Sequence, residues 1–168
     1  RRYPNVELWA ADITGTIEAL HRLKPGDSLP TPHPYPPLRW PGVDLVVSLN
    51  LLSQLGVLPG EWIERRLGPG AADKAGAFSA ARARRHLDDL TQCRATVCLI
   101  ADVECRDVGP DGTILDCEES VAGLALPAAT DEWLWPIAPA PETDSVVSEV
   151  RRVIVAYDPG KAAPGAGG

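Results

Sequence analysis

The sequence predicts an α/β domain built on an open, doubly wound and mostly parallel sheet. Two runs of mainly apolar residues, at 44–48 and 96–101, are typical of parallel strands that helices cover on both faces. Helical patterns separate these runs, and strands that alternate with helices predict a parallel sheet. The last third of the chain differs, because residues 133–137 and 150–157 predict an antiparallel pair of strands at the C-terminal side of the sheet.

The first predicted elements are a strand, a helix and a long connection. Residues 6–12 alternate at first and end in Asp12, so we expect a strand whose carboxyl end carries this aspartate. Residues 13–23 follow as a helix, which Thr14 or Thr16 is able to cap. Seven prolines at positions 25–41 predict an extended loop in place of a regular element.

The middle of the chain predicts one strand and three helices. Residues 44–48 form the strand, and residues 50–58 predict a helix that ends before a Pro-Gly pair. Residues 61–67 predict a short helix, and residues 72–92 carry the clearest helical pattern. We assign the basic run of this last helix to a solvated face, because long basic side chains normally stay in water. The run consists of Arg82, Arg84, Arg85 and His86.

The third predicted strand covers residues 96–101 and ends before Asp102. The turn sequence Gly-Pro-Asp-Gly at 109–112 predicts a hairpin that returns through residues 113–117. Strand, helix, strand, helix, strand and a final antiparallel part therefore follow one another along the chain.

The chain length of 168 residues suits one domain with its own core, and we assign residues 1–158 to it. Residues 159–168 consist mainly of Gly, Ala and Pro and predict a disordered tail. Methionine is absent, even at position 1, which predicts that the domain is incomplete at its N-terminus and that its first strands lie upstream.

Composition limits the classes of partner. A net charge of −7 at pH 7 argues against a nucleic-acid partner. No apolar stretch reaches the roughly 18 residues that cross a bilayer, so we expect no membrane span. The four cysteines form no C-x-x-C pair and the histidines are scattered, which predicts free thiols in the cytoplasm and no metal site.

Polar residues follow the predicted strands at their carboxyl ends. Ser48 closes the second strand, Asn50 comes directly after it, and Asp12 and Asp102 stand at the ends of the two other strands. Open α/β sheets bind their ligands beyond these ends. We therefore expect Asp12, Ser48 and Asp102 to lie on one rim of the sheet.

Two segments carry a resemblance to a known family. They read YPNVELWAADITG at 3–15 and DLVVSLNLLSQL at 44–55, with shorter matches at 86–87, 99–102, 133–136 and 150–153. Together they resemble bacterial proteins with the Rossmann-like fold of class I S-adenosylmethionine-dependent methyltransferases. The resemblance extends over most of residues 3–157.

This resemblance implies a seven-stranded sheet that ends in an antiparallel strand pair, and S-adenosylmethionine as the cofactor and small-molecule methyl donor. Asp12 and Ile13 would then lie near the adenine of the cofactor. Ser48 and Asn50 would face the methyl donor and the substrate as catalytic residues. The methyl acceptor is not implied by any of these residues.

The cofactor loop of the family is the main departure. Family members hold the cofactor with a glycine-rich turn after their first strand, and no such turn precedes a strand–helix unit in this chain. The chain therefore resembles the C-terminal part of the domain. By itself it is expected to bind the methyl donor poorly or not at all.

A second interpretation is a haloacid-dehalogenase-like, Mg²⁺-dependent phosphatase. Residues 12–16, Asp-Ile-Thr-Gly-Thr, fit the pattern D-x-[D/T]-G-T of that family, in which the first carboxylate is the nucleophile and a tight turn holds phosphate. Ser48, which closes an apolar strand, would be another part of the site, and Lys74 would neutralise phosphate charge. Asp102 and Asp107 would hold the magnesium ion.

A third interpretation is a non-catalytic interaction module. Trp133 and Trp135 stand on alternate residues and so share one face of a predicted strand. If that face is uncovered it forms an adhesive patch, whereas packing of both rings in the core is the structural alternative. His86 is open to two interpretations in the same way, as a general base or as a residue at the helix surface.

Overall fold

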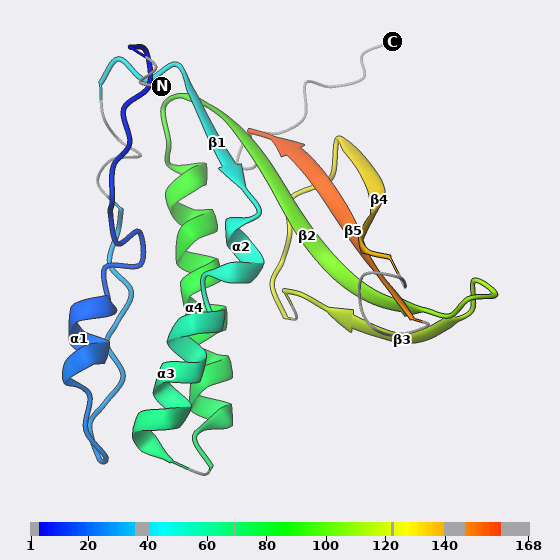
Figure 1. Ribbon diagram of the computed structural model, residues 1–168. Helices are drawn as coiled ribbons and strands as arrows, with labels where there is room; N and C mark the ends of the chain where they lie inside the picture. The colour runs from blue at the N-terminus through cyan, green and yellow to red at the C-terminus, as the bar shows by residue number, and fades with distance from the viewer. Residues whose placement is uncertain (1–3, 36–40, 69, 122, 140–146, 159–168) are drawn as a thin grey trace.

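The protein is described from a computed structural model, in which residues 4–35, 41–68, 70–121, 123–139 and 147–158 are placed. The described chain is α/β with a mixed, open sheet (Figure 1). The helices are α1 (Ile17–Arg22), α2 (Leu51–Gln54), α3 (Val57–Leu67) and α4 (Ala72–Thr91). The strands are β1 (Leu45–Leu49), β2 (Thr96–Val108), β3 (Ile114–Glu119), β4 (Asp131–Ala138) and β5 (Ser148–Tyr157).

The sheet is mostly antiparallel, so the prediction of a mostly parallel sheet is wrong. Its strand order is β1-β2-β5-β4, and β3 pairs with β2 beyond the end of β1. Only β1 and β2 are parallel among the described pairs, in a register that joins Leu45 to Thr96 and Leu49 to Ile100. The other pairs, β2 with β3, β2 with β5 and β4 with β5, are antiparallel.

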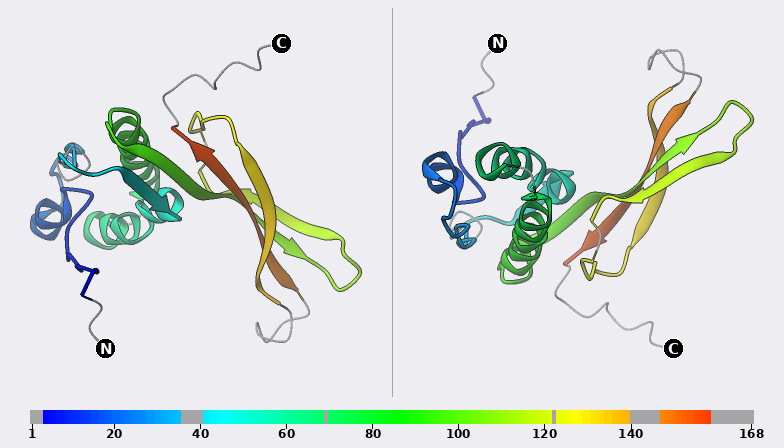
Figure 2. Two further views of the ribbon diagram at one scale, coloured as in Figure 1. Left: turned by 90° about the horizontal axis from the view of Figure 1, so that it is seen from above. Right: turned by 90° about the horizontal axis from the view of Figure 1, so that it is seen from below.

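The length of β2 is the physical reason for this difference. Its apolar start was predicted as a strand of residues 96–101, but β2 continues to Val108 through an irregularity between Asp102 and Glu104. The second half of β2 pairs with the hairpin strand β3 on one side and with β5 on the other. One long strand therefore serves as the parallel partner of β1 and as the centre of an antiparallel sheet (Figure 2).

A helical layer packs against one face of the sheet. On β2 the odd-numbered side chains from Val97 to Val103 join the core with α2 and α4. The members of this core include Leu52, Leu87, Leu90, Val97, Leu99, Ala101, Val103 and Ile154. On β1 the opposite face is open, because Leu45, Val47 and Leu49 are 52–63% exposed. These residues therefore do not form a doubly wound sheet, in which helices would cover both faces.

The first predicted strand, residues 6–12, is not a strand. Its apolar side chains are exposed, at 55% for Val6, 91% for Leu8 and 55% for Trp9. An extended segment becomes a strand only when a neighbour accepts its backbone hydrogen bonds, and in the described chain this segment runs outside the sheet order β1-β2-β5-β4. It leads instead into a turn at Asp12 that precedes α1.

The helices also pack on one another. Leu20 and Leu23 contact Ile63 of α3 and Phe78 of α4 in a second apolar cluster. At the start of α3 a Cβ atom on Gly56 would lie 2.3 Å from the Cβ atom of Ser79. Glycine at position 56 therefore allows α3 and α4 to approach closely, and Ser79 Oγ donates a hydrogen bond to the Gly56 carbonyl at 3.2 Å.

Several local predictions are confirmed. The long helix appears as α4, the hairpin strand as β3, and the antiparallel pair near the C-terminus as β4 and β5. The predicted helix at 50–58 is divided into α2 and the start of α3, which also contains residues 61–67. The predicted tail at 159–168 lies outside the described residues. None of the described helices has the length and apolar character that a bilayer crossing requires.

Candidate functional site

Asn50 holds the junction at the carboxyl end of β1. It adopts a left-handed backbone conformation (φ 51°), which asparagine tolerates better than most residues. Its backbone N–H donates to the Ile100 carbonyl at 2.8 Å, and its Oδ1 accepts a hydrogen bond from the Asp102 N–H at 3.1 Å. Two hydrogen bonds to β2 therefore fix the turn from β1 into α2.

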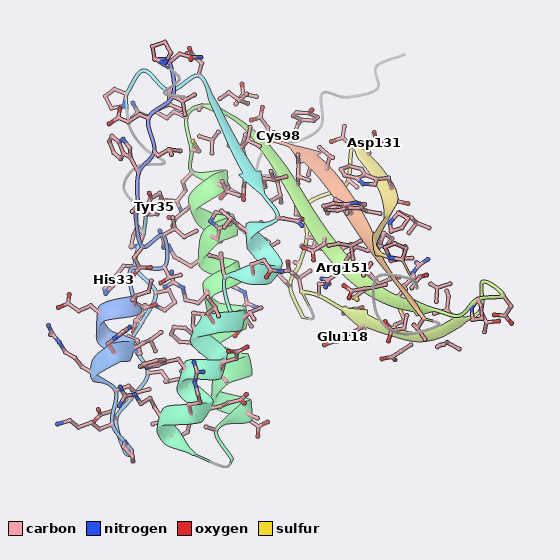
Figure 3. The ribbon with its side chains drawn as sticks, in the orientation of Figure 1. His33, Tyr35, Cys98, Glu118, Asp131 and Arg151 are labelled. Atoms are coloured by element: carbon pink, nitrogen blue, oxygen red, sulfur yellow. The ribbon has the colours of Figure 1, made fainter. Side chains whose placement is uncertain are left out.

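Asp102 is the centre of a buried ionic cluster beside this turn. The residue is 2% exposed, and its Oδ2 accepts a hydrogen bond from Arg151 Nη1 at 2.7 Å. Its Oδ1 accepts a short hydrogen bond from Ser53 Oγ in α2. With both oxygens engaged, the carboxylate joins α2, β2 and β5, as a buried charge must be paired and hydrogen-bonded (Figure 3 labels Arg151).

Arg151 completes this cluster from β5. Burial lowers the pKa of Arg151, but hydrogen bonds to Glu149 and Asp102 and the charges around it outweigh burial, so the pKa lies above its ordinary value. The guanidinium is thus a permanent cation at all pH values at which the protein is studied.

Ser48 lies on the helical side of β1. The residue is 2% exposed, and its Oγ is 2.8 Å from Nε2 of His86 in α4. Burial lowers the pKa of His86, Asp89 opposes this effect, and Arg82 adds to it. The imidazole is therefore neutral near pH 7 and connects β1 to α4. A hydroxyl beside a neutral histidine has the composition of an activated nucleophile, but Ser48 is shielded from solvent.

Asp12 stabilises the turn before α1. One carboxylate oxygen accepts hydrogen bonds from the Thr14 N–H (2.8 Å) and hydroxyl, and the other accepts from the Ile17 N–H at 2.9 Å. Burial raises the pKa of Asp12, but these hydrogen bonds, with that to Thr14 the largest, bring it below its ordinary value. Ile13, the second residue predicted to bind the cofactor, is half-buried in the same turn.

This arrangement bears on the phosphatase interpretation. The N–H groups of Thr14 and Ile17 donate to the Asp12 carboxylate, so they do not form an empty cradle for phosphate. The candidate magnesium ligand Asp102 is paired with Arg151. Among the described residues, no cluster of three or more His, Cys, Asp or Glu side chains has the geometry to hold a metal ion.

Hydrogen bonds divide the predicted site residues into separate groups. Hydrogen bonds of the described residues join Asn50 to Asp102. They join Ser48 to His86 of α4, and Asp12 to its own turn. No hydrogen bond of the described residues joins Asp12, Ser48 and Asp102 to one another, and the contact found at the expected rim is that of Asn50 with Asp102, where β1 meets β2.

Arg82 was assigned to a solvated helix face, and this is wrong. It is 2% exposed, and its Nε and Nη1 atoms have no hydrogen-bond partner among the described residues. Burial lowers its pKa, while the charges of Asp12 and Asp89 oppose the shift. Position 82 stands seven residues after Ala75 and four after Phe78, both buried, so helical spacing could have revealed its burial.

Asp89 belongs to the same buried polar region and lies in the last turn of α4. It is 4% exposed and forms an ion pair with Arg85. Its Oδ2 also accepts a hydrogen bond from the backbone N–H of Tyr35 at 3.1 Å, which attaches the proline-rich segment to α4. Figure 3 labels Tyr35 in this segment. Sequence reasoning missed this contact, because the two residues are 54 positions apart.

A cavity of about 440 Å³ lies between α1 and the helices α2 and α3. Sequence reasoning did not anticipate it. Its wall begins at Leu51, directly after Asn50, and Thr14 and Ile17 line it from the Asp12 turn. The remaining lining residues are Leu20, His21, Gln54, Leu55, Leu58, Pro59, Trp62 and Arg65. The cavity has the size and the mainly apolar wall of a small-molecule site.

Comparison of the chain with protein-family models, with curated proteins and with solved structures gave no match.

Proposed function

We propose that the chain is the C-terminal part of a class I S-adenosylmethionine-dependent methyltransferase-like domain. The observation that carries this proposal is the strand order β1-β2-β5-β4, in which a parallel pair is followed by a final strand that runs antiparallel between β2 and β4. The sheet of the methyltransferase family, which the sequence resembles, ends in such an antiparallel pair. The sequence segments at 3–15 and 44–55 support the same family.

Asn50 is the residue best placed to bind the methyl donor. It stands at the carboxyl end of β1, where open α/β sheets bind ligands. Its Oδ1 is engaged by the Asp102 N–H, while Nδ2 has no partner among the described residues and can donate to a ligand oxygen. The turn of Asp12 and Ile13 would contact the adenine, since the Asp12 oxygen that accepts from the Ile17 N–H keeps a second acceptor position.

These residues suit only one end of the cofactor. Asp12, Ile13 and Asn50 offer an acceptor, an apolar side chain and a donor. A glycine-rich turn, which would hold the amino-acid end of the donor, does not precede a strand–helix unit in this chain. S-adenosylmethionine supplies the methyl group when bound. The contribution of this chain is to position it, and we expect a dissociation constant on the order of 1 mM.

Calorimetry or saturation-transfer NMR with S-adenosylmethionine tests the proposal. Binding should saturate in the parent chain, weaken at least about fivefold in Asn50→Ala and stay unchanged in Asn5→Ala, which removes the same side chain from an exposed position. The fivefold figure corresponds to loss of one hydrogen bond. Absence of saturation, or equal binding by both variants, contradicts the assignment of Asn50 to the methyl donor. Mg²⁺-dependent hydrolysis of p-nitrophenyl phosphate that disappears in Asp12→Asn would instead favour the phosphatase interpretation.

A further inference from the structure

The cavity between α1 and α3 has an aromatic floor that is held in place. Trp62 Nε1 donates a hydrogen bond to the Leu20 carbonyl at 2.9 Å, which fixes the orientation of the indole. His21 stacks on the same ring, with 4.9 Å between centroids and 21° between planes. A fixed ring offers contact area at low entropic cost, because no rotamer has to be frozen when a ligand arrives.

Positive charge collects beside this ring. The guanidinium carbons of Arg65 and Arg66 lie 5.5 and 4.8 Å from the Trp62 centroid. Both arginines are therefore held near the cavity by cation–π interaction. Neither has a carboxylate partner among the described residues, in contrast to Arg22, whose ion pair with Glu18 neutralises it nearby.

The wall of the cavity carries no acidic side chain among its described residues. This local absence of acid contrasts with the chain as a whole, which has a net charge of −7. The remaining wall is aliphatic, with Ile17, Leu55 and Leu58 among its members. Shape, aromatic floor and charge together select an apolar ring that bears a negative group.

We propose that this cavity is a binding site for a small aromatic carboxylate. The ring of the ligand lies against Trp62 and the aliphatic wall, and its carboxylate accepts hydrogen bonds from Arg65 at the mouth. Guanidinium–carboxylate pairs are planar and charge-assisted, which makes arginine the favoured partner of such a group. The site goes beyond the proposed function, because ligand binding there requires neither the methyl donor nor transfer of a group.

The test uses three probes of one shape without S-adenosylmethionine. They are 2-naphthoate, the neutral 2-naphthamide and the cationic 2-naphthylmethylammonium. We expect 2-naphthoate to bind at least about tenfold more tightly than the amide, since hydrogen bonds to charged groups are the stronger ones, and the ammonium ion to bind most weakly. The indole N–H signal of Trp62 in a proton–nitrogen correlation spectrum should shift on titration with 2-naphthoate.

Variants separate the cavity from general anion attraction. Arg65→Gln should weaken 2-naphthoate binding about tenfold and leave 2-naphthamide binding unchanged. Arg84→Gln removes the same charge from the exposed part of α4 and should have no effect. Ile17→Trp, at a side chain that is 48% exposed, should fill the cavity and abolish binding of both probes while the melting temperature is retained.

Equal affinity for the three probes, no loss on Arg65→Gln, or equal losses for Arg65→Gln and Arg84→Gln would each overturn the proposal. These outcomes are independent of the methyltransferase proposal, which depends on S-adenosylmethionine binding and on Asn50.

Discussion

The Asp102 carboxylate and the Arg151 guanidinium form an ion pair at 2.7 Å, and Asp102 is 2% exposed. This pair crosses the sheet from β2 to β5, and Ser53 ties it to α2. It stands where the parallel part of the sheet changes into the antiparallel part. The pair therefore connects the parallel and the antiparallel parts of the sheet in the folded protein.

Removal of one partner of this pair should destabilise the fold. We expect Arg151→Met to lower the free energy of unfolding by about 3 kcal/mol, because it leaves a buried carboxylate without its countercharge. The same substitution at Arg22, in the exposed pair with Glu18, should cost less than about 1 kcal/mol. Urea denaturation of both variants measures this, and equal effects would show that the buried pair contributes no more than the exposed one.

The close approach of α3 and α4 gives a matched pair of glycine substitutions. Gly56→Ala should lower the free energy of unfolding by about 1–3 kcal/mol, because its Cβ atom would meet Ser79 at 2.3 Å. A Cβ atom on Gly76, in the second turn of α4, would meet no described atom within 4 Å, so Gly76→Ala should raise the free energy of unfolding by about 0.5–1 kcal/mol. Thermal or chemical unfolding of the two variants measures whether the free energy of unfolding falls or rises. A stabilising Gly56→Ala would contradict the contact with Ser79.

His86 should make the stability depend on pH. Its pKa in the folded protein lies below the ordinary value of 6.5, so the unfolded chain takes up a proton at a higher pH than the folded protein does. The contribution of neutral His86 to the free energy of unfolding is then complete above pH 6.5. It is lost as the pH falls through the pKa that His86 has in the folded protein. His86→Gln should flatten the pH profile of urea midpoints below pH 6.5. His33→Gln is the control and should keep the parent profile.

Asp12 should also make the free energy of unfolding fall as the pH is lowered, at more acidic pH than His86 does. Its pKa in the folded protein lies below the ordinary value of 3.8, so its stabilising effect is complete above that pH and is lost as the pH falls through the folded pKa. Asp12→Ala should cost about 1 kcal/mol near pH 6, because the Thr14 and Ile17 N–H groups lose their acceptor. The deficit relative to the parent should shrink at pH 3. Asp116→Asn, at an exposed site in β3, serves as the charge control.

Local pattern predicted the elements that need few distant contacts. The helix α4 follows from 20 residues with a continuous apolar stripe, and β3 follows from a turn sequence that brings neighbouring residues together. The segment at 6–12 has the same strand-like pattern, but none of the described strands pairs with it. Periodicity reports which side chains prefer burial, and it does not report whether a partner strand is available.

The candidate site was predicted in the same uneven way. Asn50 was found because its place after an apolar strand is visible in the sequence. Its link to Asp102 across 52 positions, and the pairing of Asp102 with Arg151, were not. Arg82 was predicted to be in solvent because of its charge, although its position puts it on the buried face of α4.

By itself the sequence determined an α/β chain with a long amphipathic helix, a parallel-type strand at β1 and an antiparallel pair near the C-terminus. Tertiary structure alone decided that β2 continues past Asp102, that the sheet is mostly antiparallel, and that one cavity lies between α1 and α3. The physical reason is that strand pairing and cavity shape arise from contacts between distant segments, whose free energy no local pattern contains.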